Sequence, residues 1–139
     1  MTHAAGKVFP IQLDLPAPPR ELSKNGRAHW AQKARLFREY KDHAAWMLVD
    51  RYGIGDEQGT SEPVVMDLVW CGPRRYWPDS DNAVERVACY RDALQAAGLI
   101  VNDSQVSIGT VTFGTGSRAA RCFVTFRLAG QRAGDVEAT

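Results

Sequence analysis

The segment from Pro63 to Cys71 constrains the fold more than any other part of the chain. Prolines bound it, and it is almost continuously apolar, with Val64, Val65, Met66, Leu68, Val69 and Trp70. Such a run is typical of a central strand that is covered on both faces of its sheet. We therefore expect an α/β fold built around this strand.

Two elements are expected before this strand. Apolar and polar residues alternate from Val8 to Leu15, which predicts a short strand that ends at Pro16 to Pro19 because the proline ring stops sheet pairing. A long helix fits Ala28 to about Tyr52. Its inner face is expected to hold the apolar residues that recur at steps of three and four, which are Trp30, Ala34, Phe37, Tyr40, Ala44 and Met47.

Three elements are expected after it. A second helix fits Asn82 to Ala97, and Gly98 is a suitable stop. Val106 to Phe113 and Arg121 to Leu128 read as a hairpin around a glycine-rich turn. The expected fold is thus a single α/β domain in the order β-α-β-α-β-β, with a mixed sheet and two helices. Its core spans about residues 8–128, and residues 131–139 are expected to form a flexible tail.

The composition fits this reading. The chain has 139 residues, of which 45% are apolar and 24% charged, so one domain can bury a core without disulfides. Three cysteines without metal-ligand spacing indicate buried free thiols in a reducing compartment. No run is long and apolar enough to span a membrane. We expect a cytoplasmic protein.

Charge is distributed unevenly although the net charge is only +1. Basic residues gather in the first third of the chain, at Arg20, Lys24, Arg27, Lys33, Arg35, Arg38 and Lys41. On charge alone, a basic binding face and an ordinary solvated helix surface are equally good interpretations. Arg74 and Arg75, directly before an acidic run, favour a polyanionic partner.

The acidic run is Pro78-Asp79-Ser80-Asp81-Asn82, at the start of the second helix, and Asp103 follows that helix. One aspartate at this position would be a helix cap. Two aspartates after the end of a buried strand are more than a cap needs, and strand ends are favoured ligand positions in α/β sheets. We expect Asp79, Asp81 and Asp103 to meet around a hard cation such as Mg²⁺. The chain from Leu99 to Val101 would carry Asp103 back to the pair.

Other candidate sites are weaker. His29 could contact a phosphate, but a role in helix capping or packing is at least as well supported. His3 and His43 lack partners at zinc-ligand spacing. The turn from Gly114 to Ser117 is not a phosphate-binding P-loop because no Lys-Ser or Lys-Thr pair follows it.

Together these motifs resemble the RusA family of Holliday junction resolvases, typical of phages and prophages. The resemblance rests on four segments in order, which are Pro18-Pro19 to Asn25, Asp79 to Asn82, Arg91 to Gly98 and Asn102 to Val106. It implies a homodimeric endonuclease that depends on Mg²⁺, with Mn²⁺ as an alternative ion, and nicks two strands of a four-way DNA junction symmetrically. Asp79, Asp81 and Asp103 would be its catalytic carboxylates and metal ligands.

The expected DNA contacts are basic, and two further residues would support the site. The contacts are Arg27, Lys33, Arg74, Arg75, Arg86 and Arg118, and the supporting residues are Asn82 and Arg91. The chain departs from the family where a lysine is usual, since either alignment of the second helix places Ala88 or Glu85 there. Two alternatives therefore stay open: a junction-binding protein with impaired catalysis, and a nuclease for other branched DNA.

Overall fold

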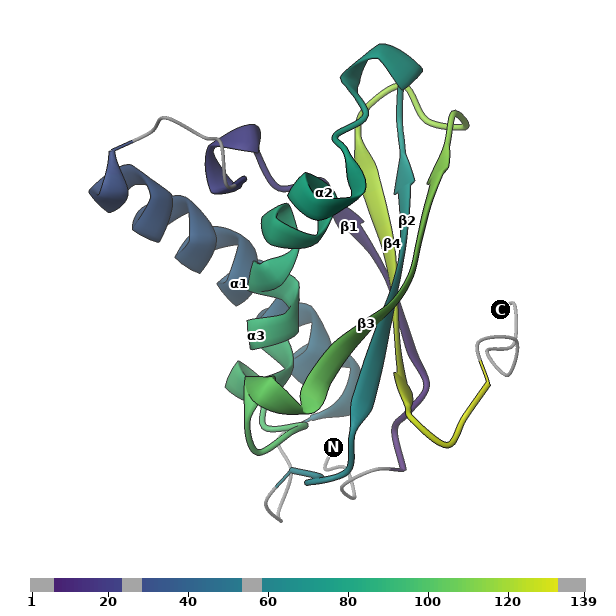
Figure 1. Cartoon of the computed structure of the whole chain (residues 1–139). Coiled ribbons are helices and arrows are strands. Elements are labelled where there is room, and N and C mark those ends of the chain that lie inside the picture. Colours follow the sequence, from purple (N-terminus) through teal and green to yellow (C-terminus); the bar gives the residue numbers. More distant parts are fainter. Residues whose placement is uncertain (1–6, 24–28, 54–58, 133–139) are drawn as a thin grey trace.

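The computed structural model describes residues 7–23, 29–53 and 59–132. Three α-helices lie on one side of a four-stranded mixed sheet (Figure 1). The strands are β1 (Ile11–Pro16), β2 (Val64–Cys71), β3 (Val106–Gly114) and β4 (Arg121–Leu128), and the helices are α1 (Trp30–Tyr52), α2 (Ser80–Arg86) and α3 (Ala88–Ala96). Short 3-10 helices are η1 (Arg20–Leu22), η2 (Arg74–Tyr76) and η3 (Asp103–Gln105). The expected α/β class with a mixed sheet is confirmed.

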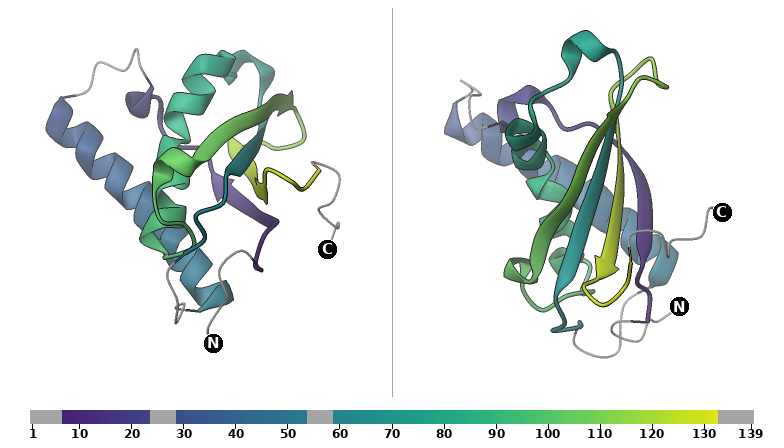
Figure 2. Two further views of the ribbon diagram at one scale, coloured as in Figure 1. Left: turned by 60° about the horizontal axis from the view of Figure 1, so that its bottom comes forward. Right: turned by 45° about the vertical axis from the view of Figure 1, so that its right-hand side comes forward.

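Strand β2 is central, as its apolar run predicts. The strand order is β1-β4-β2-β3, so β2 pairs with β3 in parallel and with β4 antiparallel. Burial alternates along it: Val64, Met66, Leu68 and Trp70 are buried, whereas Val69 is 39% exposed. The expectation of cover on both faces is therefore wrong, because all three helices pack on the same face of the sheet (Figure 2).

The predicted hairpin is also wrong. Strands β3 and β4 do not pair with each other, because β2 lies between them. The strands on either side of β2 are about 10 Å apart, a gap that the connection 115–120 spans easily. Helices α2 and α3 form the crossover that makes β2 and β3 parallel. The glycine-rich segment thus passes over the end of β2 to connect β3 with β4.

A β-bulge interrupts the pairing of β2 with β3 next to Asp67. The register shifts between Met66 and Leu68, so Asp67 faces two residues of β3. Its Oδ1 accepts hydrogen bonds from the Thr110 backbone N–H (2.8 Å) and hydroxyl (3.1 Å). A Cβ at Gly109 would lie 2.2 Å from that oxygen, so the bulge requires glycine there.

The predicted inner face of α1 is not buried at the N-terminal end of the helix. Only Ala44 and Leu48 of this helix are buried, and Trp30 is 76% exposed. In Figure 1 the first turns of α1 project away from the sheet, whereas its later turns lie behind α3. The apolar period of α1 therefore describes its second half, which packs against α3.

The second predicted helix is interrupted. Val87 has φ −92° and ψ 5°, and it separates α2 from α3. Gly98 ends α3 with φ +78°, and the Leu99 backbone N–H donates to the Leu94 carbonyl at 2.9 Å, so the predicted stop is confirmed. Leu99 and Ile100 are buried and lead the chain to η3.

One core lies between the helices and the sheet. Its largest fully buried side chains are Trp70, Tyr90, Phe126, Ile11, Leu15, Leu48, Met66, Leu68 and Leu94. Cys89 and Cys122 are buried free thiols, as expected. Gln131, placed in the flexible tail by the sequence, is instead held by hydrogen bonds with Phe9, Arg127 and Leu128, and residues 133–139 lie outside the described part. In the described ranges, no helix combines the length and apolar character that crossing a membrane requires.

Candidate functional site

The loop between β2 and α2 is anchored to the end of the sheet by Gly72 and Trp77. The Gly72 N–H donates to the Gly114 carbonyl (3.0 Å), and the Trp77 indole N–H donates to the Gly72 carbonyl (2.9 Å). The Trp77 ring stacks on Phe113, with 5.2 Å between centroids. A Cβ at Gly72 would lie 3.2 Å from the Ala120 Cα. These contacts join the loop to the ends of β3 and β4.

Three predicted DNA-contact arginines lie at this end of the sheet. Arg74 and Arg75 are exposed in η2, and each guanidinium lies over an aromatic ring, at 5.4 Å from the Trp77 centroid and 4.9 Å from the Tyr76 centroid. Arg118 is exposed on the connection from β3 to β4, which reaches the same end (Figure 1). Stacking on a ring restricts the arginines while leaving their charge in solvent.

The acidic pair follows this loop. Asp79 is the N-cap of α2, and its two carboxylate oxygens accept from the Asn82 backbone N–H (2.8 Å) and side-chain amide (3.2 Å). The side chain of Asp81 is exposed and forms no hydrogen bond or ion pair with any residue that the structure describes. Asp79 therefore does cap the helix, with Asn82 as its partner, and Asp81 is the carboxylate that capping leaves unused.

Asp103 lies elsewhere. Its backbone N–H donates to Gln95 Oε1 (3.0 Å) at the end of α3, and its carboxyl lies within interaction distance of that of Asp92. The 3-10 helix η3 is fixed by Gln105, whose side-chain amide donates to the carbonyls of Thr60 (2.8 Å) and Glu62 (2.9 Å). Asp103 therefore lies at the C-terminal end of α3, whereas Asp81 lies at the N-terminal end of α2.

The expected meeting of all three carboxylates within one chain is not observed. From Asp81 to Asp92 the helical chain rises by about 16 Å. Within residues 7–23, 29–53 and 59–132, no three His, Cys, Asp or Glu side chains form a group able to hold a metal ion. The physical reason is that Leu99 and Ile100 are drawn into the core at the far end of α3, where Ile100 bridges to Thr60.

The carboxyl pair of Asp92 and Asp103 was not foreseen from the sequence. Burial raises the pKa of Asp92, as do the hydrogen bond from Asp103 and its negative charge, while Arg91 and Lys41 act in the opposite direction. A cavity of about 360 Å³, lined by Lys41, Asp92, Gln95 and Ala96, opens beside the pair. Burial and the neighbouring carboxyl therefore both disfavour the charged form of Asp92, so its pKa lies above the usual value.

We expect Asp92→Asn to raise the melting temperature at pH 7. The raised pKa means that the folded protein binds a proton more tightly than the unfolded chain, so wild-type stability falls as pH rises from about 4 through the folded pKa. The Asn side chain does not titrate, so the variant escapes this loss of stability. Its gain in melting temperature over the wild type should vanish at pH 4 and below. Thermal unfolding at both pH values checks this, with Asp50→Asn on exposed α1 as control. An equal shift at both pH values would contradict it.

Arg86 and Arg91 are enclosed rather than presented to a ligand. Arg86 Nε donates to the Pro18 carbonyl (2.8 Å), and its guanidinium lies 4.5 Å from the Trp70 ring centroid. Burial lowers the pKa of Arg86. Arg91 Nε is buried and has no hydrogen-bond partner in the described structure. Arg86 therefore connects α2 to the loop after β1.

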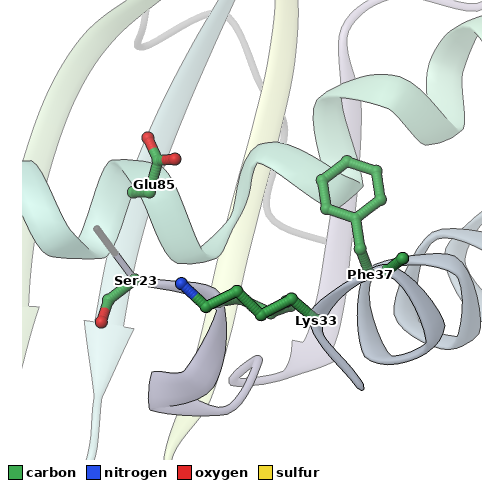
Figure 3. A pocket seen from close by; sticks show the side chains of 6 residues that line it. Ser23, Lys33, Phe37 and Glu85 are labelled. Atoms are coloured by element: carbon green, nitrogen blue, oxygen red, sulfur yellow. The ribbon is translucent and has the colours of Figure 1, made fainter. Parts of the chain in front are cut away.

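Lys33 lines a second cavity, of about 410 Å³, between η1, α1 and α2. Figure 3 shows its ammonium reaching toward Ser23, with Glu85 across the pocket. Glu85 is one turn after Asp81 on α2, so α1 brings a lysine next to this part of α2. Arg27 lies outside the described residues. His29 caps α1, since its Nδ1 accepts from the Ala31 N–H at 3.2 Å.

Comparison with known proteins finds similarity to an uncharacterized protein. No protein-family model matches the chain. An uncharacterized protein from Xylella fastidiosa (strain Temecula1) is 34% identical over 89 residues, which are 61% of this chain and 56% of that protein. The chain thus spans little more than half the length of this relative.

Proposed function

We propose that this protein is a Mg²⁺-dependent endonuclease that acts as a homodimer on four-way DNA junctions, as its resemblance to the RusA family implies. The observation that carries the proposal is the exposed, unpaired Asp81 beside Asp79, at the same end of the sheet as the exposed Arg74, Arg75 and Arg118. Metal-assisted cleavage of a phosphodiester needs both a surface that binds the anionic backbone and side chains that hold the cation. The same resemblance implies a phage or prophage origin and action in the cytoplasm of a bacterial host.

The acidic pair fits a partial magnesium site. Mg²⁺ is commonly held by one or two carboxylates together with waters and substrate phosphates. Asp81 offers both oxygens, and the oxygens of Asp79 retain acceptor capacity beside their bonds to Asn82. The ion would supply a polarised phosphate and an activated water. Asn82 fixes the rotamer of Asp79 and so orients one ligand.

The arginines would hold the phosphate backbone. Arg74 and Arg75 stand on aromatic rings and Arg118 lies on the neighbouring connection, so the three charges are available to an extended anion. Such contacts position a nucleic acid without reading its sequence. Lys33, in its cavity beside Glu85, adds a cation on the α1 side of Asp81.

A second candidate function is junction binding with impaired catalysis. It is favoured by the absence of the family's lysine at Glu85 and Ala88, and by the position of Asp103 away from Asp81. A third is cleavage of flaps or forks. The test is incubation of purified protein with labelled four-way junctions, flaps, forks and linear duplex in Mg²⁺, Mn²⁺ or EDTA. Ion-dependent paired nicks in the junction support the proposal, and binding without nicking supports the second candidate.

Replacing Arg74 and Arg75 together by Ala should weaken junction binding and make its salt dependence shallower. Each arginine is expected to neutralise one phosphate, so the slope of log affinity against log salt should fall by about 2. The melting temperature should hardly change because both side chains are exposed. Binding titrations at several salt concentrations measure the slope, and Lys7→Ala with Arg51→Ala, at exposed positions outside the proposed contact set, is a control of equal charge. An unchanged slope would remove the pair from the interface.

A further inference from the structure

The N-terminal half of α1 presents an apolar stripe that the core covers only in part. Trp30, Ala34 and Phe37 recur at steps of four and three, so they lie on one face of the helix. Trp30 is 76% exposed, Ala34 is also exposed, and Phe37 is half-buried. The packing of this protein therefore leaves two aromatic rings of one helix face accessible to a ligand.

Part of this stripe forms the wall of the cavity between η1, α1 and α2. The cavity has a volume of about 410 Å³ and is lined by Leu22, Ser23, Lys33, Ala34, Phe37 and Glu85. Three of these side chains are apolar, and Figure 3 shows Lys33 and Glu85 approaching the cavity from α1 and α2. Cavities that bind small ligands span about 300–1,000 Å³. This one lies near the lower limit and suits a single flat ring system.

The two charged side chains of the cavity are available to a ligand. Neither Lys33 nor Glu85 forms a side-chain hydrogen bond or ion pair with a residue that the structure places. A lysine donates hydrogen bonds and a carboxylate accepts them, so the lining offers both with balanced charge. Glu85 would repel a phosphate. A neutral, flat ligand with a donor and an acceptor on one edge matches both groups, and nucleobases have such edges.

The cavity lies next to the proposed metal ligand. Glu85 is four residues after Asp81, which places it on the same face of α2 and about 6 Å further along the helix. A DNA strand advances about 3.4 Å per nucleotide. A base within one or two nucleotides of a phosphate at Asp81 therefore comes within reach of the cavity. Packing against an aromatic ring offsets part of the cost of unstacking that base from its neighbours.

We propose that this cavity holds one unstacked nucleobase of the DNA strand whose phosphate is bound at Asp81. The base packs against the apolar wall, Lys33 donates to a ring nitrogen or carbonyl, and Glu85 accepts from an exocyclic amino group. Adenine, cytosine and guanine carry an amino group and thymine does not, so thymine fits least well. The DNA strand rests on the proposed function, whereas the preference for a base rests on the lining of the cavity.

The first test needs no nuclease activity. Deoxyadenosine, deoxycytidine, thymidine and, separately, inorganic phosphate are titrated into isotope-labelled protein, and the backbone amide shifts are followed by NMR. We expect the shifts to concentrate at the residues that line the cavity, with thymidine binding roughly tenfold more weakly than the other two nucleosides. Shifts of these residues with phosphate alone, or no shifts there with any nucleoside, overturn the proposal.

Variants of the two charged residues test their roles. Glu85→Gln should remove the discrimination against thymidine, because an amide both donates and accepts hydrogen bonds. Lys33→Met should weaken binding of all three nucleosides by roughly tenfold. Glu39→Gln and Lys41→Met change the same residue types elsewhere on α1 and should bind as the wild type does. Circular dichroism checks each fold, and Lys33→Gln replaces a misfolded Lys33→Met. Unchanged discrimination in Glu85→Gln overturns the role of Glu85.

The second test places the base in DNA. Junctions with one abasic nucleotide at successive positions around the crossover are titrated in EDTA with wild type and with Phe37→Ala. Wild-type affinity should fall roughly tenfold at one position, and Phe37→Ala should show no further loss there, because both changes remove the same contact. Equal losses in both proteins at every position overturn the role of the cavity in DNA binding.

The two tests separate this inference from the proposed function. If wild-type protein neither binds nor nicks branched DNA, the proposed function fails, and the nucleoside titration still decides whether the cavity takes a base. If wild-type protein nicks junctions but no nucleoside reaches the cavity, the function stands and this inference fails.

Discussion

Asp81→Asn is expected to slow junction nicking strongly while leaving the fold and DNA binding intact. Asn keeps the shape of the side chain and removes the charge that would hold Mg²⁺. Since Asp81 has no partner among the described residues, the loss should not disturb the helix, whose cap is Asp79. We expect single-turnover nicking to fall by about 10²–10³-fold, as several kcal/mol of charge stabilisation are lost.

Two controls make this prediction specific. Asp50→Asn changes an aspartate of α1 that is also exposed and should nick at the wild-type rate. Gel-shift binding to the junction in EDTA should match for wild type and Asp81→Asn. Near wild-type nicking by Asp81→Asn in Mg²⁺ would show that the acidic run serves only to start α2, and the nuclease proposal would be wrong.

Asp67→Ala is expected to have the largest effect on stability. Asp67 Oδ2 accepts from Arg127 Nε at 2.8 Å, with side-chain exposures of only 12% and 16%, and Asp67 Oδ1 holds the bulge of β3. Removing one partner leaves the guanidinium poorly solvated and frees the Thr110 N–H, so the free energy of unfolding should fall by about 3 kcal/mol. Urea unfolding at pH 7 measures it.

A second ion pair in the same sheet provides the matched control. Asp14 and Arg121 are 2.9 Å apart, but their side chains are 56% and 37% exposed, so Asp14→Ala should cost less than about 1 kcal/mol. Burial raises the pKa of Asp67, but the hydrogen bonds from Arg127 and Thr110 outweigh burial and lower it overall. Its contribution is therefore present above about pH 4 and lost as pH falls further. Equal losses for both variants would contradict this account.

The parts of the fold that follow from local sequence were predictable. The apolar run of β2 identified the central strand, and Gly98 marked the end of α3 by its positive φ. The partner of β4 was not predictable from adjacency, because β3 is nearer in sequence while β2 and β1 provide its pairing. Strand order depends on which apolar faces the helices cover, and no local pattern contains that information.

The candidate site was predicted in part for the same reason. Asp79, Asp81, Arg74 and Arg75 are neighbours in the sequence, so their proximity followed from the sequence itself. Arg86 looked like any exposed basic residue, because its contacts with Trp70 and Pro18 come from distant segments. The pairing of Asp103 with Asp92 across the end of α3 depended on how the core takes up Leu99, and spacing alone could not show it.

The position of β4 in the middle of the sheet sets the order of events when the chain is made. Ile11 of β1 pairs with Phe126 of β4, and β4 also pairs with β2, so β1 has no strand beside it until β4 has been synthesised. Contacts between such distant segments slow folding. A nascent chain that stops before Arg121 would hold β2 and β3 together with their crossover helices but leave β1 without a neighbouring strand. Folding during translation is therefore expected to finish with the insertion of β4.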